Sequence, residues 1–98
     1  MKVIADIAIV PIGVGVSLSK YVAACEKIFI EAGLKTALHA NGTNVEGEWE
    51  VVFTALRKCH QTLHEMGVPR LSTNMRLGTR VDREQTMQDK IQSVQAKL

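Results

Sequence analysis

The sequence has little net charge and no long apolar run. Lysine and arginine number 12 against 10 for aspartate and glutamate, and the basic residues are scattered along the chain. Proteins that bind nucleic acid normally carry a basic patch, so this composition argues against a nucleic-acid partner. A membrane-spanning helix needs about 18 or more consecutive apolar residues, and no segment approaches that length. We therefore expect no membrane insertion.

Cysteine is also scarce, and a secretion signal is not evident. The start, MKVIADIAIVPIG, carries a lysine and an apolar run, but Asp6 interrupts the run and no small-residue cleavage site follows. We expect this segment to stay in the fold as a strand. Cys25 and Cys59 fall on the apolar faces of expected helices, which is typical of reduced core thiols. The sequence therefore predicts a cytoplasmic protein.

The usual signatures of catalysis and cofactor binding are missing. His60 and His64 lie in HQTLH, which lacks the glutamate that HExxH enzymes use as a general base. Gly13 and Gly15 precede an expected helix, but Leu18 replaces the last glycine of GxGxxG, and no P-loop lysine follows. A metal site and a phosphate-binding loop remain alternatives to simple packing and turning. No nucleophile and base can be paired, so we expect no enzyme activity, metal or cofactor.

Strand and helix patterns alternate along the 98 residues, enough for one small domain. A hydrophobic content of 46% with 22% charged residues is that of an ordinary globular protein. Residues 2–10 are apolar at nearly every position, which predicts a central strand covered on both faces and ended by Pro11. After this strand we expect a helix, capped by Ser17 or Ser19 and stopped by Gly33, and then two strands, at 34–40 and from Thr43 to Val45 or Glu46. A helix at 48–66 and a strand at 68–81 follow. Asp82, with Gln85, is expected to cap a last helix.

This β-α-β-β-α-β order with one more helix predicts an α+β, ferredoxin-like sandwich spanning residues 1–98 as a single domain. Two helices would cover one face of a four-stranded antiparallel sheet. The other face would be bare in a monomer, although the first strand is apolar on both faces. We therefore expect a partner subunit, the last helix or both to cover it, and a homo-oligomer. The last helix carries a narrow apolar seam for such assembly: Met87, Ile91, Val94 and Leu98.

Polar side chains gather between Lys35 and Trp49, in KTALHANGTNVEGEW. Asn41-Gly42 predicts a type I′ hairpin turn, because both central positions of that turn need a positive φ. The three-residue spacing of Thr43 and Glu46 predicts a capping box for the following helix. Side chains able to hold a small molecule are thus placed where a sheet leads into a helix: His39, Asn41, Thr43, Asn44, Glu46 and Glu48.

Opposite charges are also expected on two neighbouring strands, at Asp6 and Arg76. A structural ion pair or a subunit contact is the simpler interpretation. The alternative is that the pair orients a polar ligand, since a buried charge is unfavourable without a partner.

Three segments together resemble the small thiamine-binding, YkoF-like family: IADIAIVPIGVG, HANGTNVEGEW and RLGTRVD. The most specific element is T-x-x-E-G at Thr43, Glu46 and Gly47, supported by Arg76 and by Arg80-x-Asp82. The resemblance covers almost the whole chain. It implies a ferredoxin-like fold, dimers and often tetramers, and binding of thiamine or its hydroxymethylpyrimidine portion without turnover.

One departure from that family lies at the hairpin, where Ala40-Asn41 replaces a Pro-Met pair found in many relatives and alters the pocket wall. An aminopyrimidine needs an acceptor for its amino group and donors for its ring nitrogens. The resemblance makes Thr43 and Glu46 the leading ligand contacts. The alternative function is a structural or regulatory oligomeric module without a vitamin ligand. Four further candidates are placed nearby by the expected turn: Ser17, His39, Asn41 and Trp49.

Overall fold

Strands and helices follow one another in the predicted order in the structure, a computed structural model that describes residues 1–98. None of the helices has the length and apolar character needed to cross a membrane. The elements are β1 (Lys2–Ile12), α1 (Ser19–Glu31), β2 (Lys35–His39), β3 (Gly42–Glu48), α2 (Trp49–Glu65), β4 (Arg70–Thr79) and α3 (Met87–Gln95).

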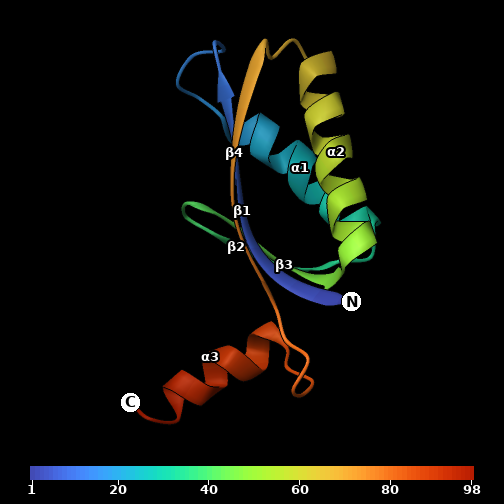
Figure 1. The fold of residues 1–98 in the computed structure, drawn as a ribbon. Helices are drawn as coiled ribbons and strands as arrows, with labels where there is room; N and C mark the ends of the chain where they lie inside the picture. The colour runs from blue at the N-terminus through green and yellow to red at the C-terminus, as the bar shows by residue number, and fades with distance from the viewer.

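The four strands form one antiparallel sheet in the order β2-β3-β1-β4. Helices α1 and α2 pack together on one face of this sheet, which we call the inner face (Figure 1). Helix α3 lies apart from them, beyond the end of β4 (Figure 1). This confirms the predicted ferredoxin-like α+β fold with an additional C-terminal helix.

The core lies between the inner face and the two helices. Val3, Ala5 and Ile7 of β1 point into it and are almost fully buried, whereas Ile4 and Asp6 point to the opposite, outer face and stay partly exposed. Helix α3 leaves most of the outer face open (Figure 1), so the covering of this face by a partner subunit stays a prediction. Both cysteines are buried and free, as predicted.

Pro11 does not end β1, which continues to Ile12 with Pro11 opposite Leu71 of β4. The reason lies in the pairing on the other side of the strand. Strand β3 pairs with β1 only as far as Ile7, so the last part of β1 has a single neighbour. Proline is tolerated there because an edge strand has fewer ladder hydrogen bonds to supply.

The start of α1 also differs from the prediction, and its end agrees with it. The helix follows Leu18, which has no side-chain cap bond, so neither Ser17 nor Ser19 caps it. Gly33 stops the helix with a φ of 82°, a conformation that favours glycine.

The capping box predicted from Thr43 and Glu46 is absent. Both residues belong to β3, which continues to Glu48, and α2 starts at Trp49 without a side-chain cap. The backbone N–H of Trp49 instead donates to the carbonyl oxygen of Met1 at 2.8 Å. Met1, just before β1, therefore supplies the acceptor for the first N–H of α2.

A capping box does occur at α3, but later than predicted. Thr86 accepts from the Asp89 N–H at 3.0 Å, and the Asp89 carboxylate accepts from the Thr86 N–H at 3.0 Å. The second contact lowers the pKa of Asp89. Asp82, the predicted cap, instead pairs with Arg80.

The hairpin between β2 and β3 turns at Ala40-Asn41, one residue earlier than predicted. No residue other than glycine has a positive φ, and Gly42 is not among the glycines that do, so the turn is not type I′. Gly42 is needed for space instead. A Cβ atom there would lie 2.8 Å from the carbonyl oxygen of Ile7.

Replacing Gly42 with alanine should therefore lower the free energy of unfolding by about 1–3 kcal/mol, because backbone atoms must move apart. Gly78 is the matched control, since its Cβ would meet nothing closer than 4.0 Å. Gly78→Ala should be neutral or slightly stabilising. Urea unfolding of both variants checks this, and equal effects would contradict it.

Candidate ligand-binding site

An apolar pocket of about 280 Å³ lies between α1, the second half of β1 and the β2–β3 hairpin. Ten of its 14 lining residues are hydrophobic, and its polar groups come from the hairpin. Such a pocket, with few polar groups on mostly apolar walls, is the usual form of a small-molecule site. We call it the hairpin pocket; its walls include Leu18, Val22, Phe29 and Leu38, and its polar residues are His39, Asn41 and Thr43.

Thr43 connects the hairpin pocket to a carboxylate on α1. Its side chain is 5% exposed, and its hydroxyl donates to Oε1 of Glu26 at 2.9 Å. The other oxygen of Glu26, Oε2, is buried and has no hydrogen-bond partner. Buried carboxylate oxygens are nearly always hydrogen-bonded, so this atom can accept a hydrogen bond from one more donor.

Glu26 was not among the predicted site residues. It lies in α1 between Val22 and Phe29, on the side of the helix that packs toward the sheet. A charged residue inside an apolar stripe was the signal that would have found it, because such a position is unfavourable without a partner.

His39 is held at the hairpin by both of its ring nitrogens. The backbone N–H of Asn41 donates to Nδ1 at 3.3 Å, so Nε2 carries the proton that Asp6 Oδ1 accepts at 2.6 Å. Asp6 does face Arg76 across β1 and β4, as predicted. It hydrogen-bonds to His39, however, and forms no salt bridge with Arg76.

Glu46 lies on the other side of the sheet from Thr43. Side chains alternate along a strand, so residues three apart point to opposite faces. Glu46 is 4% exposed, and its carboxylate accepts from the Met87 N–H at 2.6 Å, with Lys2 Nζ 3.9 Å away. Thr43, His39 and Asn41 thus all line the hairpin pocket, but the His39 ring turns to Asp6 on the outer face. Glu46 instead holds the first turn of α3.

Ser17 and Trp49 do not line the hairpin pocket. Ser17 is exposed in the loop before α1. Trp49 opens α2 and packs its ring against Phe53, with ring centroids 4.9 Å apart. Both were placed near Thr43 by the expected turn, which forms one residue earlier and with another geometry.

The histidines of HQTLH have separate structural partners. His60 Nε2 lies 2.6 Å from Thr73 Oγ1, and His64 Nδ1 lies 2.8 Å from the Val68 carbonyl oxygen. No group of three metal-ligating side chains forms anywhere in the chain.

The two thiols lie beside the pocket, with Cys25 in its wall and Cys59 fully buried. The hydrogen bond with the Cys25 side chain and burial raise the pKa of the Cys59 thiol. Cys59 therefore stays protonated at neutral pH, and a protonated thiol is a poor nucleophile.

Comparison with known proteins identifies the family of this chain. Residues 5–95 match the family described as thiamine-binding protein. The chain belongs to this family. It is 54% identical over its full length to the UPF0045 protein sll0230 of Synechocystis, covering 81% of that protein. It is 42% identical to the UPF0045 protein ECM15 of Eremothecium gossypii, covering 94% of that protein.

Solved structures of the family share the fold. Protein MJ1052 of Methanocaldococcus jannaschii has a TM-score of 0.89 at 32% identity, with 96% of each chain covered. A proposed thiamine biosynthesis/salvage protein of Thermotoga maritima has a TM-score of 0.81 at 20% identity, covering 96% of this chain and 99% of that one. At that identity the second likeness establishes the fold alone.

The Thr43–Glu26 contact can be tested by its effect on stability. Thr43→Val should lower the free energy of unfolding by about 1–3 kcal/mol, because it leaves a buried carboxylate without its donor. In a Glu26→Met background the same change should have little effect, since no carboxylate remains to be satisfied. Urea unfolding of the four proteins measures the coupling.

A matched control is Thr36→Val on β2, because that hydroxyl is partly buried and makes no side-chain hydrogen bond. It should change stability little. An equal cost for Thr43→Val with and without the Glu26 carboxylate would contradict the contact.

Proposed function

We propose that this protein binds thiamine, or the hydroxymethylpyrimidine portion of thiamine, in the hairpin pocket and does not transform it chemically. The observation that carries the proposal is that the buried Oε2 atom of Glu26 has no hydrogen-bond partner. The other oxygen of this carboxylate accepts from Thr43, which lines the pocket. Membership of the thiamine-binding protein family supports the choice of ligand. So does the description of the Thermotoga maritima protein.

The polar groups suit an aminopyrimidine. Its exocyclic amino group has two hydrogens to donate, and Glu26 has one buried oxygen available to accept. The Thr43 hydroxyl gives its proton to Glu26, so its lone pairs are free to accept the second hydrogen. Asn41 lines the same pocket, and an amide side chain carries N–H donors that suit a ring nitrogen.

The apolar walls suit a flat ring. Leu18, Val22 and Phe29 of the α1 side face Leu38 across the pocket, and aromatic rings gain from such burial. The volume of about 280 Å³ lies just below the roughly 300–1,000 Å³ usual for ligand sites. A pyrimidine or thiamine is therefore a better match than a larger cofactor.

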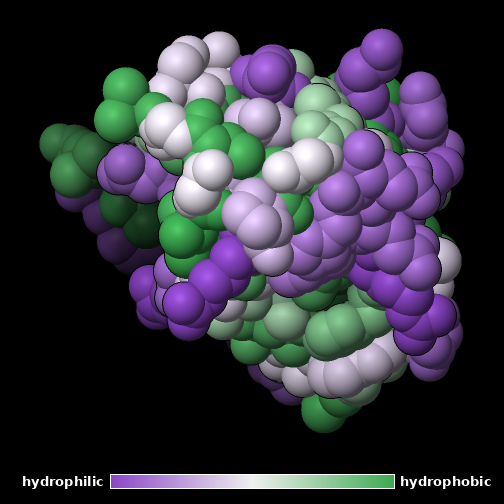
Figure 2. Space-filling view, turned by 90° about the horizontal axis from the view of Figure 1, so that it is seen from above, coloured by the Kyte–Doolittle hydropathy of each residue, from purple (hydrophilic) through white to green (hydrophobic).

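Several apolar side chains reach the surface of the free chain, among them Val10, Ile12 and Leu38 (38%, 41% and 64% exposed). Figure 2 shows patches of exposed hydrophobic residues beside a band of hydrophilic residues. We propose that the protein works as a homodimer or homotetramer, which would cover part of this surface. Its free, buried thiols favour a reducing, cytoplasmic location.

The alternative is a structural or regulatory module whose function lies in assembly. It is favoured by α3, none of whose residues is buried: its Ile91 and Val94 are 47% and 61% exposed, and Leu98 beyond its end is 98% exposed. Under this alternative Ile91→Asp dissociates the assembly in sedimentation experiments, and no pyrimidine compound stabilises the protein.

Thermal unfolding with excess thiamine or hydroxymethylpyrimidine tests the binding proposal. Ligand at about one hundred times its dissociation constant should add about 2.7 kcal/mol of stability, a rise of several degrees in Tm. Thr43→Val and Glu26→Gln should each weaken binding about tenfold, because each removes one polar contact.

Glu46→Gln serves as the matched control, since that carboxylate faces away from the hairpin pocket. It should bind like the wild-type protein. If Glu46→Gln weakened binding and Thr43→Val did not, the ligand would have to lie on the outer face.

A further inference from the structure

A second pocket, of about 210 Å³, lies on the outer side of the sheet, where β1 and β4 meet the β4–α3 loop and α3. Eight of its nine lining residues are not hydrophobic, which sets it apart from the hairpin pocket. We call it the basic pocket. Four cationic side chains and one acidic side chain line it, namely Lys2, Arg80, Arg83 and Lys90 with Glu84.

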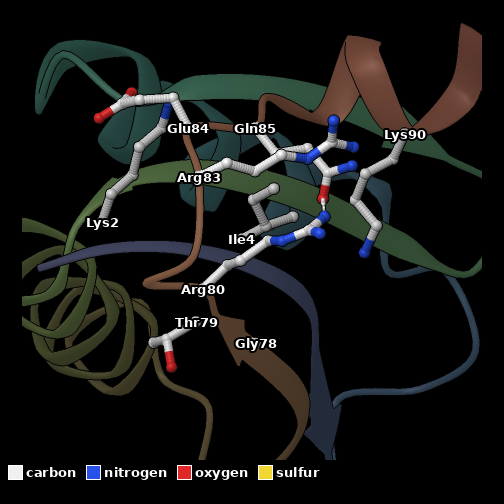
Figure 3. A pocket seen from close by; sticks show the side chains of 9 residues that line it. All are labelled: Lys2, Ile4, Gly78, Thr79, Arg80, Arg83, Glu84, Gln85 and Lys90. Carbon is white, nitrogen blue, oxygen red and sulfur yellow. Dashed lines mark hydrogen bonds between the residues drawn. The ribbon is translucent and has the colours of Figure 1, made fainter.

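Three of these cations point toward one another. Figure 3 shows the charged ends of Arg80, Arg83 and Lys90 gathered around Gln85, whereas the carboxylate of Glu84 points away from them toward the side of Lys2. Like charges held this close repel one another, unless an anion lies between them.

The hydrogen bonds of these groups show how much of the positive charge is already balanced. Arg80 donates to both carboxylate oxygens of Asp82, at 2.5 and 2.9 Å, and to Gln85 Oε1 at 3.0 Å. The pairing with Asp82 raises the pKa of Arg80. Arg83 and Lys90 have no side-chain hydrogen bond and no ion pair in the structure. Arg83 lies near the carboxylates of Asp82 and Asp89 and helps to lower the pKa of both, but no hydrogen bond holds the ends of Arg83 and Lys90, so both can turn to a ligand.

We propose that the basic pocket binds the phosphate group of a small phosphate monoester. An arginine fork pairs with two phosphate oxygens at once, and a lysine adds a point charge. Arg80 is held in place by Asp82 and Gln85, so one wall of the site is formed before the ligand arrives. A polyanion such as nucleic acid fits poorly, because the cations form one cluster and the net charge of the chain is only +2.

The basic pocket is separate from the hairpin pocket. Ile4 and Lys2 of β1 face the basic pocket, whereas Ile7 and Thr43 belong to the hairpin pocket. The two pockets share no lining residue and are divided by the sheet. A single small ligand cannot occupy both, so each pocket can bind a ligand of its own chemical class.

Isothermal titration with ribose 5-phosphate, and with ribose as the uncharged control, tests the proposal at constant ionic strength. The phosphate ester should bind and ribose should not. Arg83→Gln and Lys90→Gln should each weaken binding about tenfold, because each removes a charge-assisted hydrogen bond.

Arg57→Gln and Lys27→Gln are the matched controls, since both side chains are exposed on the helices of the opposite layer. They should bind ribose 5-phosphate like the wild-type protein. No binding by the wild-type protein, or equal losses in the control variants, would overturn the proposal.

The same variants should keep the Tm increase produced by thiamine. A protein that responds to thiamine but not to ribose 5-phosphate would defeat this proposal alone. A protein that binds ribose 5-phosphate through Arg83 and Lys90 but ignores thiamine would support this proposal and defeat the proposed function.

Discussion

Strand β1 is hydrogen-bonded to β3 on one side and to β4 on the other, and this double pairing decides what each face of the molecule can do. The register places Ala5 opposite Val45 and Ile7 opposite Thr43. Because side chains alternate along every strand, burying Ala5 and Ile7 under the helices sends Thr43 to the same inner face. Glu46, three residues later, is directed to the outer face by the same rule.

The two faces consequently offer different chemistry. On the inner face, apolar walls surround Thr43, whose hydroxyl donates to a carboxylate with one unused oxygen, and this suits a flat, hydrogen-bonding ring. On the outer face, Glu46 anchors the start of α3, and α3 in turn brings Lys90 beside Arg80 and Arg83. The T-x-x-E-G element therefore contributes to both faces: its threonine to a ligand pocket, its glutamate to the placement of a helix.

Much of the fold was predictable because its signals are periodic. The apolar run of β1, the alternation along β4 and the apolar stripes of α1 and α2 identified the elements and nearly all of the buried positions. The turn and the helix caps were less predictable, because a three-residue spacing such as that of Thr43 and Glu46 fits a capping box and a continuing strand equally well. Only the tertiary contact of Trp49 with Met1 separates the two.

The candidate site was predictable in part for a similar reason. His39, Asn41 and Thr43 lie close together in sequence and meet at the hairpin. Glu26 comes from a helix 17 residues away, and only the packing of α1 on the sheet brings it to Thr43. The basic pocket was hidden still further, because its cations are scattered in sequence from Lys2 to Lys90 and only the position of α3 gathers them.

The central claim is that the ligand occupies the inner face. Methyl-selective NMR of the protein titrated with thiamine tests it most directly, because apolar reporters stand on both sides of the sheet. The account predicts shifts and intermolecular contacts at Leu18, Val22 and Leu38 of the hairpin pocket. Perturbations confined to Ile4 and Ile91 on the outer side would contradict it.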